Sequence, residues 1–476
     1  MDSTKHAREE QQDSSHIEQT SEDSVERARY SISQESSESK SSIHRLPFEV
    51  LAHIFEFYVE VTKAWFYKPV KGPFLLGAIC QLWRDIAWTT PSLWATFTFK
   101  LEDNASEKQV QLAIGWLHRS GELPLSIYFH SHRQMPEMEP IISPLIDVII
   151  QLFARCRRLE LTGISSLALS RFSRYQGPSG LRFLRLRRMK LTTPFYLGSQ
   201  AAPTELNIQD IHLNFLVIDW SNLTDFSASG LHFDEVLQVL SLAPRMVRCC
   251  QDSVTSSTPS TRYQSIIHLH LKDLLMELHD NSAIASFFQY TTFPNLSHCQ
   301  VKTHSAFPTT AFLGFLDRSS CSIQTLGITT SSISGEGLIQ IARVLHSLTN
   351  LILDTSHSPL HPFYNALCED SRYANHSILP GNVVLLPLLQ HLSITTACLF
   401  PWACLPGIRH QYLHKGNTRT ILPGRLDLKS ITVSFEPASD FSFKNGVNDY
   451  QKTSAELVDL KKDLDLSLKF KRKRYI

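Results

Sequence analysis

The sequence predicts an α/β protein in which a small helical unit is followed by an irregular solenoid of strand-plus-helix repeats. Two patterns lead to this prediction. Between residues 46 and 94, apolar side chains recur at the spacing of helices. From residue 156 onwards, the motif L-x-x-L-x-L recurs, with other apolar residues allowed at its three fixed positions. With 476 residues, of which 42% are hydrophobic, the chain is long enough for both parts.

The helical unit opens with LPFEVLAHIFEFYVE at residues 46–60. Its apolar spacing predicts an amphipathic helix over 46–58. Pro47 suits the first helical position, where a missing N–H costs nothing, and Glu49 suits the first turn, where the helix dipole favours an acid. So apolar a helix needs something to pack against.

A second helix is predicted after the linker VEVTKAWFYKPVKGP. Pro91 should end it, because proline disfavours helical backbone in the residue before it. Beyond residue 100, we expect a helix ending near 120, a strand over 125–129 and a helix over 141–155. The apolar residues that recur one turn apart in the second helix are Leu75, Leu76, Ile79, Leu82, Trp83 and Ile86.

The recurring motif predicts the strands of the solenoid. Its middle residues lie 25 to 43 positions apart, and the shorter spacings match a leucine-rich repeat of one strand and one helix. Spacings near 40 indicate repeats with loop insertions or a copy that has lost its pattern; TELNIQDI around Leu206 is a candidate tenth copy. An irregular α/β domain is the alternative. The nine copies are Cys156/Leu159/Leu161, Leu181/Leu184/Leu186, Leu223/Phe226/Ala228, Ile266/Leu269/Leu271, Leu296/Cys299/Val301, Ile323/Leu326/Ile328, Leu348/Leu351/Leu353, Leu389/Leu392/Ile394 and Leu428/Ile431/Val433.

Composition narrows the classes of function. The net charge is +1, so the whole-chain field does not favour nucleic acid. No run of 18 apolar residues is present, so we expect no membrane crossing. The N-terminus lacks the apolar stretch of a secretory signal, and the nine cysteines show no CxxC spacing. We therefore expect reduced cysteines and a location in the cytoplasm, the nucleus or both.

These patterns divide the chain into five parts. The second part is the helical unit and the fourth is the solenoid. The first is rich in serine and acids and is expected to be disordered. The last ends in a run of basic residues at 469–474, which suits either a solubilising tail or a nuclear-import signal. The parts are 1–42 (Ser/acid-rich tail), 43–100 (helical unit), 101–158 (helical linker and first strand), 159–440 (solenoid) and 441–476 (charged C-terminal tail).

Three segments of the helical unit together resemble an F-box. They are LPFEVLAHIF at 46–55, ICQLWRDIA at 79–87 and PSLW at 91–94, which come in the family's order at plausible distances. GWLHRSGELPLSI and FARCRRLEL look like the linker and first repeat of fungal F-box proteins. The chain is thus similar to fungal F-box proteins with a leucine-rich-repeat-like C-terminal region. Its linker at 59–73 is longer than in the shortest F-boxes.

The resemblance implies a partner. F-boxes of this family dock on a small adaptor of the Skp type, which joins them to a cullin in an SCF-type ubiquitin ligase. Trp83 is expected to act chiefly as a core residue between helices, although this region also touches the adaptor in the family. By matching to the motif, the residues expected at or just under the adaptor interface are Leu46, Pro47, Val50, Leu51, Ile54, Phe55 and Trp83.

The resemblance also implies a function without catalysis. The solenoid would bind a protein substrate whose identity the sequence does not indicate. Tethering would then raise the local concentration of substrate lysines near the conjugating enzyme. Two alternatives stay open: an F-box scaffold that acts without ubiquitination, and an enzyme with an unrecognised site in the repeat region.

Chemical motifs give the enzyme alternative no support. The sequence lacks a phosphate-binding loop, H-E-x-x-H and G-x-S-x-G. His268 and His270 in IIHLHL are expected to share one face of a strand as a packed or surface pair, since no third ligand has metal-site spacing. Cys249 and Cys250 are expected to be packing residues. We therefore expect no cofactor and no metal.

Overall fold

The structure is a computed structural model that divides into two compact units. The first comprises residues 1–97 and 115–123, and the second comprises residues 98–114 and 124–476. The predicted tail over 1–42 lies outside the described residues, apart from Ser42. The structure describes residues 42–63, 72–102, 105–132, 136–197, 201–255, 264–355, 358, 360–368, 385–398, 400–405, 408, 411–415, 418–422, 428–435 and 464–470.

Short helices build the first unit. The predicted first helix is confirmed, although it begins after Pro47 instead of at it and continues to Lys63, through the first residues of the predicted linker. The Pro47 carbonyl accepts the N–H groups of Val50 and Leu51, each at 3.1 Å, and so starts the helix. The elements are η1 (Ser42–Arg45), α2 (Phe48–Lys63), α3 (Gly72–Gly77), α4 (Gln81–Thr89) and η2 (Pro91–Trp94).

The prediction of one continuous second helix is wrong, because the structure has two helices there. Cys80 has extended backbone (φ −156°, ψ 171°) and separates α3 from α4. The two helices approach closely at Gly77, where a Cβ atom would lie 1.6 Å from the ring of Trp88. The break therefore lets α3 pack against α4, and α4 ends before Pro91 as expected.

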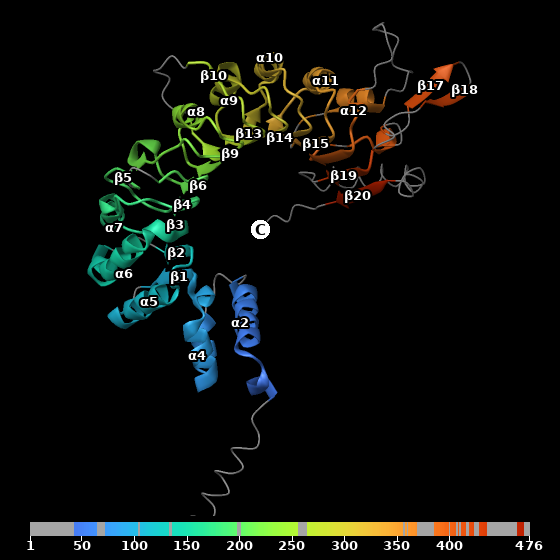
Figure 1. Ribbon diagram of the computed structural model, residues 1–476. Helices are drawn as coiled ribbons and strands as arrows, with labels where there is room; N and C mark the ends of the chain where they lie inside the picture. The colour runs from blue at the N-terminus through green and yellow to red at the C-terminus, as the bar shows by residue number, and fades with distance from the viewer. Residues whose placement is uncertain are drawn as a thin grey trace, which may run out of the picture. The chain divides into compact units, whose positions relative to one another are not determined.

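A largely parallel sheet of 14 strands dominates the second unit. The strands lie side by side in chain order, and within this sheet the neighbouring strands from β2 to β20 pair in parallel. Figure 1 shows them along the inner side of an arc, with helices on its outer side. The strands are β1 (Thr96–Leu101), β2 (Leu125–Ser131), β3 (Cys156–Thr162), β4 (Phe183–Arg187), β6 (Glu205–Gln209), β8 (Asp225–Ser229), β9 (Arg248–Val254), β11 (Asp273–Leu278), β13 (His298–Ala306), β14 (Thr325–Ser332), β15 (Asn350–Thr355), β16 (His391–Thr396), β19 (Ser430–Phe435) and β20 (Asp465–Phe470).

One buried position recurs across this sheet in register. Its side chains are at most 8% exposed, so the row forms the core between the sheet and its helices. Eight of the nine predicted motif copies supply a strand to this row, and the candidate copy at Leu206 supplies β6. The row is Ile127, Leu159, Leu184, Leu206, Phe226, Cys249, Leu274, Cys299, Leu326, Leu351, Leu392, Ile431 and Leu466.

The predicted copy at Ile266/Leu269/Leu271 is wrong. The strand in the sheet is β11, which buries Leu274 and Met276 instead. Residues Ile266–Ile267 form the short strand β10, which pairs with β12 (Thr291–Thr292) outside the large sheet. The sheet register decides between two apolar segments that look alike in sequence.

Both explanations of the long spacings hold, at different places. Strands β6 and β9 divide the two spacings above 40 in the first half, so row residues from Leu159 to Leu351 lie 20 to 27 positions apart. Strands β15, β16 and β19 are neighbours although their row residues lie 41 and 39 positions apart, so those segments carry insertions.

Helices link most consecutive strands of the sheet, but the described residues hold no α-helix between β4 and β6, β6 and β8, or β9 and β11. The helix predicted to end near 120 and the strand over 125–129 are confirmed, and the helix predicted over 141–155 is present but runs from Glu139 to Gln151. Neighbouring helices share an aromatic core: the Phe288 ring lies 4.9 Å from that of Phe312 and 5.3 Å from that of Phe315. The helices are α5 (Glu107–Arg119), α6 (Glu139–Gln151), α7 (Ser166–Ser170), α8 (Phe233–Leu242), α9 (Asn281–Tyr290), α10 (Thr309–Ser319), α11 (Gly335–Val344) and α12 (His361–Cys368).

Smaller elements complete the described chain. They are η3 (Pro136–Met138), η4 (Phe153–Arg155), η5 (Arg171–Arg174), η6 (Leu213–Phe215), η8 (Trp402–Cys404), the pair β5 (Phe195–Tyr196) and β7 (Leu216–Val217), and the hairpin β17 (Gln411–Lys415) and β18 (Thr418–Leu422). Within the described ranges, no helix has the length and apolar character that crossing a membrane requires.

The charged C-terminal tail predicted over 441–476 is wrong in one segment. Residues Asp465–Phe470 form β20, where Leu466 pairs with Ile431 and is 8% exposed. Apolar and polar residues alternate in DLSLKF, so one face can be buried while the charges stay outside. The rest of the basic run, residues 471–474, lies outside the described residues.

Candidate partner-docking surface

Helix α2 carries apolar side chains on two faces. One face packs inside the first unit, with Leu51, Phe55 and Val59 at most 5% exposed. The other face carries a second apolar row at intervals of four, three and four residues, which is the spacing of one helix face. These side chains are 41–73% exposed, and we call them the α2 row: Val50, Ile54, Phe57 and Val61.

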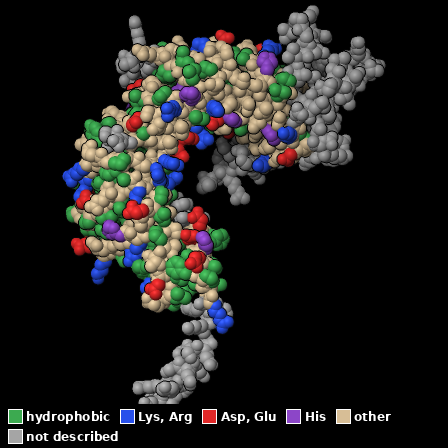
Figure 2. Space-filling view, in the orientation of Figure 1, with side chains coloured by type: hydrophobic (Ala, Val, Ile, Leu, Met, Phe, Trp, Pro, Cys, Tyr) green, Lys and Arg blue, Asp and Glu red, His purple; other side chains and the backbone are tan. Residues whose placement is uncertain are grey.

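Exposed apolar side chains also occur on the next two helices. Leu75 of α3, Ile79 between the helices and Leu82 of α4 are 40%, 57% and 37% exposed. Residues 46–82 thus supply nine of the 21 large exposed apolar side chains in the described chain. Figure 2 shows hydrophobic side chains gathered over these helices. Such a concentration on a small unit is typical of a surface that binds another protein.

An aromatic core holds the helices beneath this surface. The Phe55 ring of α2 lies 4.8 Å from the Trp83 ring of α4, which joins the two helices. Trp94 is fully buried, and its Nε1–H donates to the Ala87 carbonyl at 2.7 Å. The Nε1–H of Trp116 in turn donates to the Trp94 carbonyl at 3.0 Å. The α2 row is therefore presented by a packed scaffold.

A polar contact ties α2 to the end of the unit. Glu56 accepts hydrogen bonds from the hydroxyl of Ser92 in η2 and from His53 one turn earlier in α2. The Ser92 bond is the main cause that holds the pKa of the Glu56 carboxyl below its usual value, with partial desolvation acting against it. Because Glu56 neighbours the exposed row, this contact helps fix the orientation of α2.

The structure separates the predicted site residues by exposure. Leu51 and Phe55 are buried under the surface, and Trp83 is half-buried against Phe55. Trp83 thus packs between helices as expected, but Trp94 is the fully buried centre of the core. The predicted residues that a partner can reach directly are Leu46, Pro47, Val50 and Ile54.

Sequence reasoning missed part of this surface. Phe57 and Val61 continue the spacing of Val50 and Ile54, so the helical period contained the signal. Leu75, Ile79 and Leu82 were predicted as helix residues but not as surface residues. They are absent from the predicted set because apolar spacing does not tell which of two apolar faces is covered.

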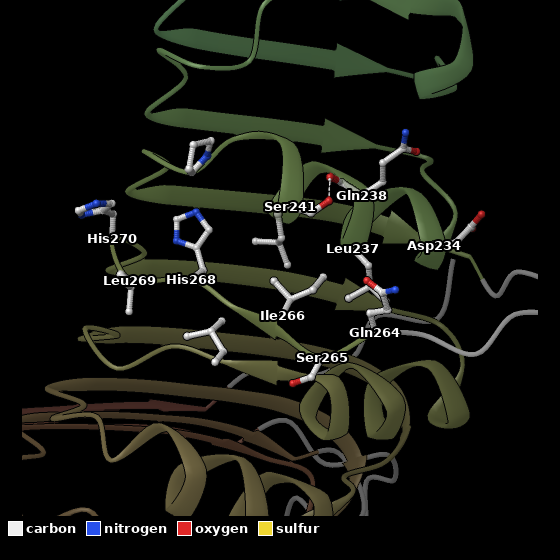
Figure 3. A pocket seen from close by; sticks show the side chains of 13 residues that line it. Asp234, Leu237, Gln238, Ser241, Gln264, Ser265, Ile266, His268, Leu269 and His270 are labelled. Atoms are coloured by element: carbon white, nitrogen blue, oxygen red, sulfur yellow. Dashed lines mark hydrogen bonds between the residues drawn. The ribbon is translucent and has the colours of Figure 1, made fainter.

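The second unit contains a pocket of about 650 Å³ between α8 and the segment around β10, shown in Figure 3. The prediction that His268 and His270 share a strand face is wrong, because β10 ends at Ile267. His268 is buried: its Nε2 lies 2.9 Å from the Ala243 carbonyl, and its Nδ1 accepts the Leu271 N–H. His270 is exposed. Because each ring nitrogen has a hydrogen-bond partner, His268 is held as a packed residue.

The predicted packing role of the adjacent cysteines holds for Cys249. Burial raises the pKa of Cys249, and likewise that of Cys156, to about 12, and it also raises the pKa of half-buried Cys250. Such thiols are protonated at neutral pH and are weak nucleophiles. Neither member of the pair has the lowered pKa of a reactive cysteine.

Comparison with known proteins gives no relative: neither the protein-family models nor the curated proteins contain a match to this chain.

Proposed function

We propose that this protein is a non-catalytic substrate receptor of an SCF-type ubiquitin ligase. Residues 43–100 are an F-box that binds a Skp-type adaptor, and through it a cullin. Residues 159–440 are a leucine-rich-repeat-like solenoid that binds a protein substrate. The observation that carries the proposal is the α2 row, which lies on the same helix as the L-P-x-E-V-L-x-x-I-F segment.

The α2 row favours a protein partner on energetic grounds. Burying an exposed valine, isoleucine or phenylalanine stabilises by about 1.5–3 kcal/mol. A scaffold that keeps four such side chains 41–73% exposed retains about half of that free energy for binding. Leu51, Phe55 and Trp83 support the binding helix from beneath, so they contribute to docking by positioning the α2 row.

Strand order in the second unit favours the solenoid part of the proposal. Consecutive strands are neighbours, and one buried position repeats across them, as expected where each repeat packs only on the next. The polar residues that alternate with this row lie on the inner strand surface. Figure 2 shows charged side chains of both signs and histidines along this inner side. An extended surface of this kind suits the recognition of a protein.

Co-purification tests the proposal. A tagged full-length chain should recover a Skp-type adaptor and a cullin, identified by mass spectrometry. The double variant Val50→Asp/Ile54→Asp should lose both, because it puts charges into the apolar row. Leu112→Asp is the matched control: Leu112 is 58% exposed on α5 and should not affect recovery. Recovery of adaptor and cullin by the double variant at the wild-type level would contradict the proposal.

A further inference from the structure

A cluster of histidines and carboxylates lies on the inner face of the sheet in the second unit. Met276 and Leu278 of β11 point into the core, so Glu277 and His279 alternate onto the opposite face. Register places Glu277 beside Lys302, and Leu278 beside Thr303. It follows that His279 comes next to His304 at the end of β13. The imidazole rings of His279 and His304 are stacked, 4.8 Å apart and 4° from parallel.

The side chains converge on one point. One ligand atom from each of Glu277, His279 and His304 lies within 4.8 Å of the other two. Ligand atoms of one tetrahedral zinc ion lie about 3.3 Å apart, as follows from bonds of about 2.0–2.1 Å. Small side-chain rotations therefore suffice. Asp252 of β9 also lies near Glu277 and interacts with it electrostatically, which brings a second carboxylate to the cluster.

A second cluster of the same composition shows what a purely structural role looks like. In the group His212, His232 and Glu235, the Glu235 carboxylate accepts the N–H of Leu213 at 2.7 Å and the N–H of His232 at 2.8 Å. It caps helix α8 and would have to abandon two backbone donors to bind a metal. Because of these hydrogen bonds, we assign Glu235 a structural role.

The Glu277 carboxylate, in contrast, interacts with side chains that can move away from it. Its Oε1 is 2.7 Å from Lys302 Nζ and 3.2 Å from His304 Nε2. The side chains of Lys302 and His304 are 48% and 54% exposed, so both can turn aside without breaking backbone bonds. The Lys302 ammonium occupies the position that a cation would take beside this carboxylate.

We propose that Glu277, His279 and His304 form a binding site for a divalent transition-metal ion, with Zn²⁺ as the preferred ion. Two imidazoles and a carboxylate, without thiolate, suit Zn²⁺ among the metals of this class. Three protein ligands leave a coordination position open toward the inner face of the sheet. This site extends the function proposed above and does not depend on it.

Titration of the full-length protein with Zn²⁺, followed by calorimetry, tests this site. Wild-type protein should bind one more equivalent than His304→Ala and His279→Ala, or bind that equivalent at least about tenfold more tightly. Lys302→Met should bind more tightly than wild type, because it removes the competing ammonium. Co²⁺ in place of Zn²⁺ should show no sulfur-to-metal charge-transfer band, which separates this site from binding at the nine cysteines.

His232→Ala is the matched control. It removes one histidine from the cluster of His212, His232 and Glu235, and it should leave Zn²⁺ binding unchanged. Circular dichroism verifies that each variant is folded. If His304→Ala does not fold, His279→Ala alone is compared with wild type. Equal Zn²⁺ binding by wild type and the folded variants would overturn the proposal. Loss of binding in His232→Ala alone would also overturn it.

Discussion

Helix α2 and strand β11 differ in how far their apolar side chains are exposed. In β11, the alternating residues Leu274, Met276 and Leu278 are at most 2% exposed. In α2, an apolar row up to 73% exposed runs alongside the buried one. The sheet buries its apolar face against other parts of the same chain, whereas α2 has more apolar surface than its own unit covers. This contrast is the reason for proposing that the partner binds the first unit.

The largest expected effect concerns the core beneath α2. Trp94→Ala should lower the free energy of unfolding of the first unit by about 3–5 kcal/mol, because it removes a fully buried ring and the donor to the Ala87 carbonyl. Hydrogen exchange of residues 48–94 measures this loss. Trp83→Ala should cost less, since Trp83 is half-buried. A loss as large as that of Trp94→Ala would show that the two tryptophans share the core equally.

A smaller effect is expected where α3 meets α4. Gly77→Ala should destabilise the first unit by about 1–3 kcal/mol, because the new methyl group meets the Trp88 ring. Gly115→Ala is the matched control: its nearest neighbour is the flexible end of Arg119 at 3.0 Å, and alanine favours helix by up to about 1 kcal/mol. Chemical denaturation should rank Gly77→Ala below wild type and Gly115→Ala level with it or above. The reverse order would contradict the packing described here.

The smallest effect concerns pH and the second unit. Burial lowers the pKa of His268 below 6.5, so the unfolded chain takes up a proton at higher pH than the folded chain. The neutral ring therefore stabilises the fold fully above pH 6.5, and this contribution is lost as the pH falls toward the folded-state pKa. His268→Gln should lower stability at neutral pH but reduce the loss on acidification. Denaturant unfolding across this range measures both; an unchanged slope would mean that His268 does not titrate differently on folding.

The strands could be predicted wherever apolar residues occupy the buried row and the other fixed positions of the motif. Strand β9 was missed because Gln251 is buried where the motif expects an apolar residue. Strand β11 was misplaced because IIHLHL imitates its pattern, and only pairing with β9 and β13 selects Leu274 and Met276. The break between α3 and α4 was missed because apolar spacing continues through Cys80.

The docking surface could be predicted in part. A match to the F-box pattern identified α2, but the pattern includes both the buried residues Leu51 and Phe55 and the exposed residues Val50 and Ile54. Sequence does not distinguish the two faces, since both are apolar at helical spacing. The proposed metal site depends on the register between β11 and β13, which the motif did not predict.

The affinity of the full-length protein for a purified Skp-type adaptor tests the central claim most directly. Calorimetry should show that Ile54→Ala weakens binding at least tenfold, since truncating an interface anchor costs about 2 kcal/mol or more. Leu275→Ala is the matched control, because Leu275 is 40% exposed on β11, close to the 44% of Ile54. The account predicts wild-type affinity for Leu275→Ala and weakened affinity for Ile54→Ala. Equal affinity of the two variants for the adaptor would contradict it.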